Sequence, residues 1–220
     1  MLLHVCGANR AARAVLLHER DAVAENFDPR TTPNAFVDSR AGEPFPETIA
    51  DLEWSSTALY EAVETARTER PAPQRQAVWG RPIDWRLFVT HFFWDAWLHE
   101  RDIVLPLGRD FATDAAETEL AVAYGLLTTG VASSFVERTF VEELDLHGLG
   151  AGVFRVAVSE PGAAEVSIVD TAGSGALRGE TMDVVDAIAG RHCELHEALH
   201  TSADRVRDLG MLRALLMTPG

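Results

Sequence analysis

The chain has 220 residues, of which 47% are hydrophobic, enough to form one large domain or two small ones. Its formal net charge of −15 argues against nucleic acid and anionic membrane as partners, because both require a basic surface. All 19 basic residues are arginine, a usage typical of a GC-rich genome, and no apolar run is long enough to span a bilayer.

The two cysteines and the first residues favour a reduced, cytoplasmic protein. Cys6 and Cys193 stand at no metal-ligand spacing, so each is interpreted as a packed residue rather than as a nucleophile. The stretch MLLHVCGANRAARAVL has neither the basic start nor the long uncharged core of a signal peptide. We therefore expect a cytoplasmic protein that does not bind membranes.

The first part of the chain is predicted to contain two helices and two loops. Helical periodicity runs through residues 2 to about 24 and through 47–67, where apolar residues recur at intervals of three, four and seven. Residues 26–46 contain four prolines and are predicted to be a loop, as is the stretch RPAPQRQAVWGRP.

Two more helices are predicted in the middle of the chain. The helix over 85–104 can be capped by Asp84, and the chain then turns at a segment that contains proline and glycine. The helix over 114–135 opens with Asp114 and Glu117, which resemble a capping box. Four helices joined by long loops predict a four-helix bundle.

After residue 138 the apolar period changes from helical to alternating. Three short runs are predicted to form three or four antiparallel strands: VEELDLHG, GVFRVAVS and AEVSIVD. A short helix and a terminal helix are predicted to follow, over TMDVVDAIAGRH and ADRVRDLGMLRALL. The predicted fold class is therefore α+β, with a helical domain over 1–138 and a small α+β domain over 139–220.

The segment HFFWDAWLHERDI, residues 91–103, carries the most informative spacing. Asp95 and His99 are four residues apart, which places them one turn apart on one face of a helix. A carboxylate oxygen and an imidazole nitrogen so placed can bind one divalent cation. Aromatic neighbours indicate that the helix is partly buried, where a charge needs a partner. A third ligand should come from another helix, and His4 is the best candidate.

Other histidines and acids near this pair allow less specific interpretations. Asp102 is interpreted as a residue that orients His99 or lies on the helix surface. His91 is interpreted as a packing histidine, with a fourth metal ligand as the alternative. Three further histidines recur at four-residue spacing and are interpreted as a solvated helix edge outside the bundle: His192, His196 and His200.

The similarity of this chain to a known family rests on two stretches, LLHVCGANRAARAVL and, about 90 residues later, WDAWLHERDIVLPLG. Together they resemble the mycothiol-dependent maleylpyruvate isomerase family of the DinB-like superfamily. The resemblance implies an N-terminal DinB-like four-helix bundle with metal ligands at His4, Asp95 and His99. Members usually have some thirty residues before the first ligand, so the chain is interpreted as an N-terminally short member.

The last part of the chain extends this resemblance. The strands and the segment MDVVDAIAGRH resemble the sterol-carrier-like C-terminal domain of the family. The resemblance implies zinc, or another divalent metal, and mycothiol as cofactors. Two histidines and one carboxylate leave an open position on a tetrahedral zinc, where water or a thiol can bind and lose a proton. An anionic substrate needs local cations, and Arg81 and Arg191 are the arginines we favour.

We therefore expect a zinc-dependent, mycothiol-using enzyme that isomerises a small organic acid from cis to trans or attaches the thiol to it. Two alternatives are a hydrolase or lyase that uses zinc-bound water, and a regulatory or binding protein without catalysis. The sequence shows no P-loop, no dinucleotide-binding glycine motif and no G-x-S-x-G motif. The expected partners are a small-molecule substrate and a low-molecular-weight thiol, and a homodimer remains an open alternative.

Overall fold

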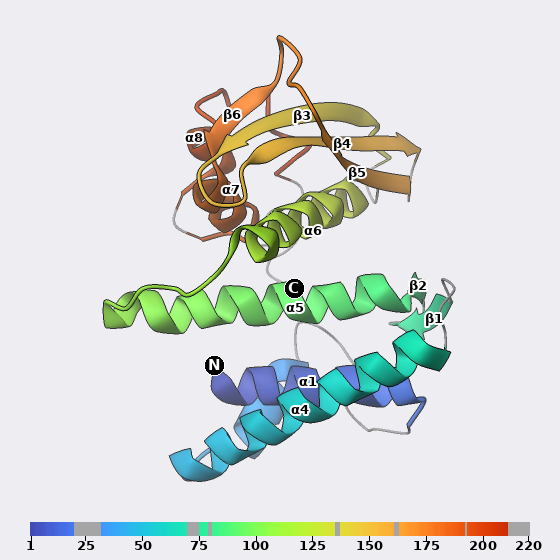
Figure 1. Cartoon of the computed structure of the whole chain (residues 1–220), viewed down its shortest axis with the longest axis vertical. Helices are drawn as coiled ribbons and strands as arrows, with labels where there is room; N and C mark the ends of the chain where they lie inside the picture. The colour runs from blue at the N-terminus through green and yellow to red at the C-terminus, as the bar shows by residue number, and fades with distance from the viewer. Residues whose placement is uncertain are drawn as a thin grey trace. The chain divides into compact units, whose positions relative to one another are not determined.

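The structure is a computed structural model that describes residues 1–19, 32–69, 75–78, 81–134, 137–160, 163–191 and 193–210. Within these ranges, N-terminal helices are followed by a C-terminal four-stranded sheet, which confirms the predicted α+β class (Figure 1). The chain divides into two compact units, Met1–Asp110 and Phe111–Gly220. Among the helices that the structure describes, none has the length and apolar character needed to cross a membrane.

In its described residues, the first unit contains four helices, a short 3-10 helix and a two-stranded hairpin. The helices are α1 (Leu2–Leu17), α3 (Thr32–Ser39), α4 (Phe45–Glu69) and α5 (Trp85–Val104), and the 3-10 helix is Leu105–Leu107. The antiparallel hairpin consists of β1 (Arg75–Val78) and β2 (Arg81–Asp84). Helix α1 packs against α3, α4 and α5, so it lies at the centre of this unit (Figure 1).

The first helix is shorter than predicted. It was expected to run to about residue 24, but it ends at Leu17 because His18 adopts the left-handed conformation with a φ of 55°. The rest of the expected helix, residues 20–24, lies outside the described residues.

Both predicted loops contain regular structure, which corrects the sequence interpretation. Residues 26–46 include α3, in which Pro33 occupies the first turn, where its missing N–H costs no helical hydrogen bond. The stretch RPAPQRQAVWGRP includes most of the hairpin, and Pro82 pairs with Ala77 in a sheet of two strands, both of which are edge strands, where proline is tolerated. Proline density alone therefore overestimated the amount of loop.

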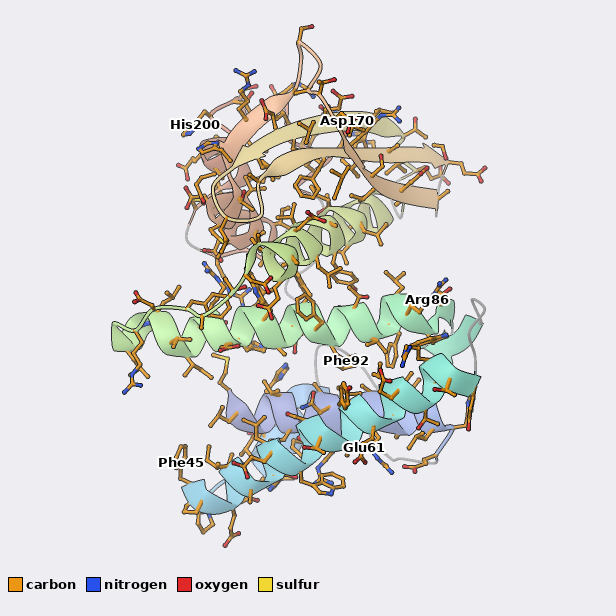
Figure 2. All side chains as sticks on the ribbon, in the orientation of Figure 1. Phe45, Glu61, Arg86, Phe92, Asp170 and His200 are labelled. Carbon is orange, nitrogen blue, oxygen red and sulfur yellow. The ribbon has the colours of Figure 1, made fainter. Side chains whose placement is uncertain are left out.

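The core of the first unit combines small residues with aromatic rings. Helices α1 and α4 contribute mainly alanines, which allow the two helices to approach each other closely. Helix α5 contributes the rings that fill the remaining space, and Figure 2 shows Phe92 directed towards α1 and α4. The buried members of this cluster are Ala12, Leu16, Ala62, Ala66, Trp85, Phe88 and Phe92.

Helix α5 begins and ends as predicted. The Asp84 carboxylate accepts a hydrogen bond of 2.9 Å from the backbone N–H of Arg86, which caps the helix. The 3-10 helix that follows ends at Gly108, whose φ of 65° is the left-handed conformation that glycine adopts without strain. The bounds of the helix that carries Asp95 and His99 are thus set by local sequence.

The second unit is a four-stranded sheet with helices. Its elements are α6 (Ala115–Ser134), β3 (Phe140–His147), β4 (Gly152–Glu160), β5 (Ala163–Val169), β6 (Leu177–Glu180), α7 (Thr181–Ile188) and α8 (Leu195–Ala198). The strand order is β5-β4-β3-β6. Strands β3, β4 and β5 are antiparallel neighbours, as predicted, but β6 runs parallel to β3 because the chain returns to the opposite edge of the sheet after β5.

Helix α6 belongs to the second unit, which the sequence pattern did not reveal. The helix packs on β4, β5 and α7, and Gly130 permits this approach because a Cβ there would lie 2.7 Å from the Cβ of Ala164. The predicted boundary at 138/139 marks the change of apolar period, whereas the division into compact units falls after Asp110. The period of apolar residues indicates secondary structure but not which elements pack together. The sequence therefore did not reveal that the fourth helix of the expected bundle packs on the sheet.

The end of the chain also differs from the prediction. A terminal helix was expected over residues 203–216, but residues 203–210 form turns, and 211–216 lie outside the described residues. Ion pairs tie this segment to strand β3 and to the residues before it. Arg205 pairs with Glu142, and Asp208 pairs with Arg138.

Candidate metal centre

One face of α5 changes from apolar to polar along its length. Phe88 and Phe92 lie in the core cluster of the first unit. Asp95 and His99 follow at spacings of three and four residues, so they continue the same face of the helix. The polar end of this face is where the predicted ligand pair lies.

One face of helix α1 also changes between apolar and polar residues, but here the polar end is at the start of the helix. Leu16 and Ala12 lie in the apolar cluster, Ala8 packs against it, and His4 follows one turn earlier in the chain. His4 contacts the C-terminal half of α5, whereas Leu16 lies in the cluster with residues of its N-terminal half. The two helices are therefore antiparallel, and the polar end of one face lies beside the polar end of the other.

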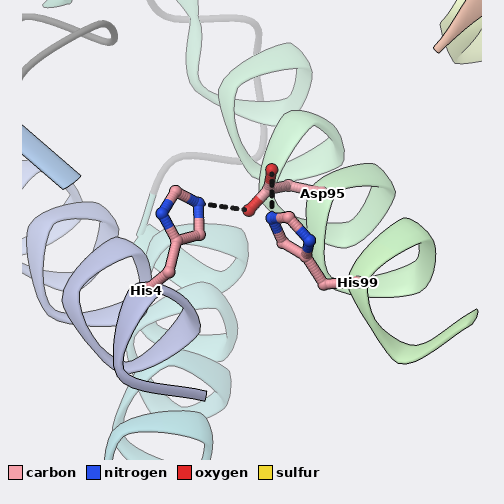
Figure 3. Close-up of side chains that lie close together, drawn as sticks. All are labelled: His4, Asp95 and His99. Carbon is pink, nitrogen blue, oxygen red and sulfur yellow. Dashed lines mark ion pairs between the residues drawn. The ribbon is translucent and has the colours of Figure 1, made fainter. Parts of the chain in front are cut away.

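The three predicted metal ligands converge at this place (Figure 3). His4 Nε2 lies 3.6 Å from Asp95 Oδ2, and His99 Nε2 lies 3.5 Å from Asp95 Oδ1. The two imidazole rings meet edge to face, with centroids 4.8 Å apart. The three ligand atoms all lie within 4.8 Å of one another, and no other trio of histidine, cysteine or acidic side chains in the described part of the chain does so.

The ligand atoms lie close enough together for one small ion to contact all three. Two ligand atoms that each lie about 2.1 Å from a tetrahedral ion are about 3.4 Å apart. His4 Nε2 and His99 Nε2 lie 3.6 and 3.5 Å from different oxygens of Asp95, and both distances are longer than an ordinary N–H···O hydrogen bond of about 2.9–3.0 Å. Two nitrogens and one oxygen would leave one tetrahedral position for a ligand that is not part of the protein.

The charges at the site suit a cation. Burial raises the pKa of Asp95, but His4, His99 and His91 lower it by more, so the pKa lies below its usual value and the carboxylate is ionised near neutral pH. The side chains of His4, Asp95 and His99 are 27%, 28% and 19% exposed, so a small ion or ligand can reach them.

Asp102 and His91 lie on either side of Asp95 and His99 along α5. The second ring nitrogen of His99, Nδ1, lies 3.3 Å from Asp102 Oδ2. His91 instead packs against aromatic rings, with centroids 5.7 Å from Phe92 and 6.5 Å from Trp94. Burial lowers the pKa of His91, and it is not part of the three-ligand group, which favours the interpretation as a packing histidine.

The two arginines predicted to bind substrate are placed in different units. Arg191 follows α7 in the second unit, where its backbone N–H donates to the Asp186 carbonyl at 2.7 Å and its side chain donates to the Ala189 carbonyl at 3.5 Å. Arg81 begins β2 in the first unit, and its side chain lies outside the described residues. Their contact with a substrate stays a prediction.

The cysteines and the other histidines that the structure describes do not join the candidate metal centre. The Cys6 Sγ is buried against α4, 4.0 Å from the carbonyl of Thr48, and burial raises the pKa of its thiol. Cys193 is half-buried in the second unit. His196 and His200 lie in and after α8 and form no metal-ligand group among the residues described, while His192 lies outside them.

An ion-pair network that holds α1 in place was not anticipated from the sequence. The nearly buried carboxylate of Asp51 on α4 pairs with both Arg10 of α1 and Arg40, which follows α3. Burial raises the pKa of Asp51, but the hydrogen bonds from Arg10 and Arg40 lower it by more. The partners are 41 and 11 residues from Asp51, so no short motif could have revealed them.

Comparison with known proteins identifies no relative. No family model matches the chain, and no curated protein and no solved structure matches it either. The geometry of the site is therefore the basis for the proposed function.

Proposed function

We propose that the chain is a zinc-dependent enzyme that uses a low-molecular-weight thiol, with mycothiol as the expected one. It would either isomerise the cis double bond of a small organic acid or attach the thiol to it. The observation that carries this proposal is the convergence of His4, Asp95 and His99, whose ligand atoms all lie within 4.8 Å of one another. In this proposal the first unit contains most of a DinB-like bundle and the second is sterol-carrier-like, as in the mycothiol-dependent maleylpyruvate isomerase family.

The composition of the ligand set favours a catalytic site over a structural one. Structural zinc sites use four protein ligands, whereas catalytic sites use three and leave one position open. Zinc bound here would lower the pKa of a thiol at that position and supply a thiolate near neutral pH. His4 and His99 offer neutral ring nitrogens to the ion, and Asp95 offers the only ligand carboxylate.

The charge at the site favours an anionic fourth ligand. A divalent ion together with the carboxylate of Asp95 leaves one positive charge, which a thiolate would neutralise. A substrate carboxylate would then need a cation of its own, and a guanidinium can bind it through two parallel hydrogen bonds. We propose Arg191 and Arg81 for this role.

The thiol is proposed to come from solution rather than from the chain. Cys6 is buried and its Sγ contacts α4, not the ligand group, and its raised pKa keeps the thiol protonated. Cys193 belongs to the second unit and is not a member of the ligand group. An added thiol should therefore be required for turnover, and changing both cysteines to serine should leave turnover within a few-fold.

The test combines metal analysis with a turnover assay on the full chain. Zinc-loaded protein is incubated with maleylpyruvate or a related cis-enoyl acid, with and without mycothiol, and the trans product and thiol adduct are measured. The matched control is His99→Ala, which removes one ligand. Turnover that needs both the thiol and His99 is the expected result.

Three other results would contradict the proposal in different ways. Turnover without any thiol would indicate chemistry by zinc-bound water. Zinc binding without turnover on any cis-enoyl acid would indicate a binding or regulatory protein. Equal zinc content in the wild type and in His99→Ala would mean that the three residues do not form a metal site.

A further inference from the structure

The two ring nitrogens of His99 face two different carboxylates. Nε2 lies 3.5 Å from Asp95 Oδ1, on the side of the ligand group, and Nδ1 lies 3.3 Å from Asp102 Oδ2. Asp95, His99 and Asp102 are spaced by four and three residues on α5, so all three side chains stay on one face through two helical turns. The imidazole of His99 is held between them.

The contact with Asp102 is a hydrogen bond in only one tautomer of a neutral His99. An ionised carboxylate can only accept a hydrogen bond, so in that tautomer the hydrogen is on Nδ1. Nε2 is then left with a free lone pair, and this is the nitrogen that lies with Asp95 and His4. A metal can bind only a nitrogen that carries no proton.

We propose that Asp102 is a positioning residue that fixes His99 in the Nδ1–H tautomer and holds its ring towards the metal. This inference rests on the proposed zinc site and assigns a role to a residue outside the ligand group. Asp102 does not belong to that group because the nitrogen it contacts points away from Asp95. Its side chain is 26% exposed, so water competes only partly for the hydrogen bond.

The two proposed histidine ligands differ in the number of carboxylates that they contact, so the effect of Asp102 should be confined to one of them. Among the contacts that the structure describes, Asp95 is the carboxylate that pairs with His4, through Nε2, and no second carboxylate pairs with it. His99 has a carboxylate on each nitrogen. Loss of Asp102 should therefore alter the tautomer of His99 and leave that of His4 unchanged.

The experiment measures tautomer and zinc affinity in the same set of variants. The variants are Asp102→Ala, Asp102→Asn and a matched control, Glu100→Ala, which removes an exposed carboxylate one residue from His99. Long-range nitrogen-15 NMR of the metal-free chain at about pH 8, where imidazoles are neutral, identifies the protonated nitrogen. Competition with a chromophoric chelator gives the zinc affinity, and circular dichroism verifies folding.

The expected results separate the hydrogen bond that orients His99 from the negative charge of Asp102. Asp102→Ala should lose the preference for Nδ1–H at His99 and bind zinc about 10–100-fold more weakly. Asp102→Asn should keep the tautomer, because its amide oxygen still accepts from Nδ1–H, and should lose less affinity. Glu100→Ala should keep both the tautomer and, within a few-fold, the affinity.

Several outcomes would overturn the inference. One is a wild-type His99 that carries its proton on Nε2, and another is an Asp102→Ala chain that keeps the wild-type tautomer. Weaker zinc binding in Asp102→Ala without a change of tautomer would point to a structural role instead. A wild-type chain that binds no zinc would refute the proposed function, and the tautomer comparison on metal-free protein would still decide the role of Asp102.

Discussion

The two units bury their side chains in different ways, and the difference bears on why the candidate metal centre lies in the first. The core of the first unit pairs alanines of α1 and α4 with rings of α5, and the same helix faces continue into the ligand group. The second unit buries larger aliphatic and aromatic side chains between its sheet and its helices. They include Leu144, Leu146, Phe154, Val156, Val158, Val184 and Val185.

The periodicity of each element determines where polar side chains can lie. In β4 buried and more exposed residues alternate, with Phe154, Val156 and Val158 buried and Arg155 exposed, so polar residues point away from the core. A helix face has no such alternation and can carry apolar residues at one end and ligands at the other. The helical unit can therefore enclose charged groups without interrupting its core.

The largest expected effect is the loss of zinc from a single ligand variant. His99→Ala should abolish zinc binding, because two remaining ligands hold the ion poorly, whereas His196→Ala in the second unit should leave one zinc per chain. Metal analysis after dialysis measures both. Zinc loss from His196→Ala would contradict the expectation that the metal binds to the first unit alone.

A core variant of the second unit should lower the stability of the chain without changing its zinc content. Phe154 is fully buried, so Phe154→Ala should lower the free energy of unfolding by about 3–5 kcal/mol. Chemical denaturation followed by circular dichroism measures this loss. Zinc stoichiometry should stay unchanged, and loss of zinc would mean that the metal centre depends on the sheet.

Zinc itself should stabilise the first unit selectively. At a free concentration of about 100 times the dissociation constant, a ligand that binds only the folded state contributes about 2.7 kcal/mol. Hydrogen exchange should therefore slow in α1 and α5 and remain unchanged in β3 and β4. All five tryptophans precede residue 110, so their fluorescence offers a second measurement of the first unit alone. If zinc slowed hydrogen exchange equally in both units, its stabilising effect would not be specific to the first unit.

The smallest expected effect concerns acid. Because the pKa of Asp51 is lowered in the folded chain, its ion pairs contribute stability above the unfolded pKa of about 4, and this contribution is lost as the pH falls further. Metal-free protein should show a shallower pH dependence of tryptophan-detected unfolding between about pH 5 and pH 3 when Asp51 is replaced by Asn. Identical slopes would show that Asp51 does not link α1 to α4.

The sequence predicted those parts of the molecule that depend on local spacing. Helix α5, its cap at Asp84 and the Asp95–His99 pair follow from residues within a few turns of one another. His4 was assigned from its helix face and from a family resemblance. Features that depend on packing were missed, among them the placement of α6 with the sheet and the parallel pairing of β6. The role of Asp51 was missed because its partners are distant in the sequence.

The proposed metal ligands come from opposite ends of the first unit, with roughly ninety residues between His4 and Asp95. An ion held by both closes a long loop of the chain, and closure of a long loop removes conformational entropy from the unfolded state. Neither cysteine forms a disulfide. In the proposed site the ion would thus be a reversible cross-link, which metal availability would make or release while the covalent structure stays the same.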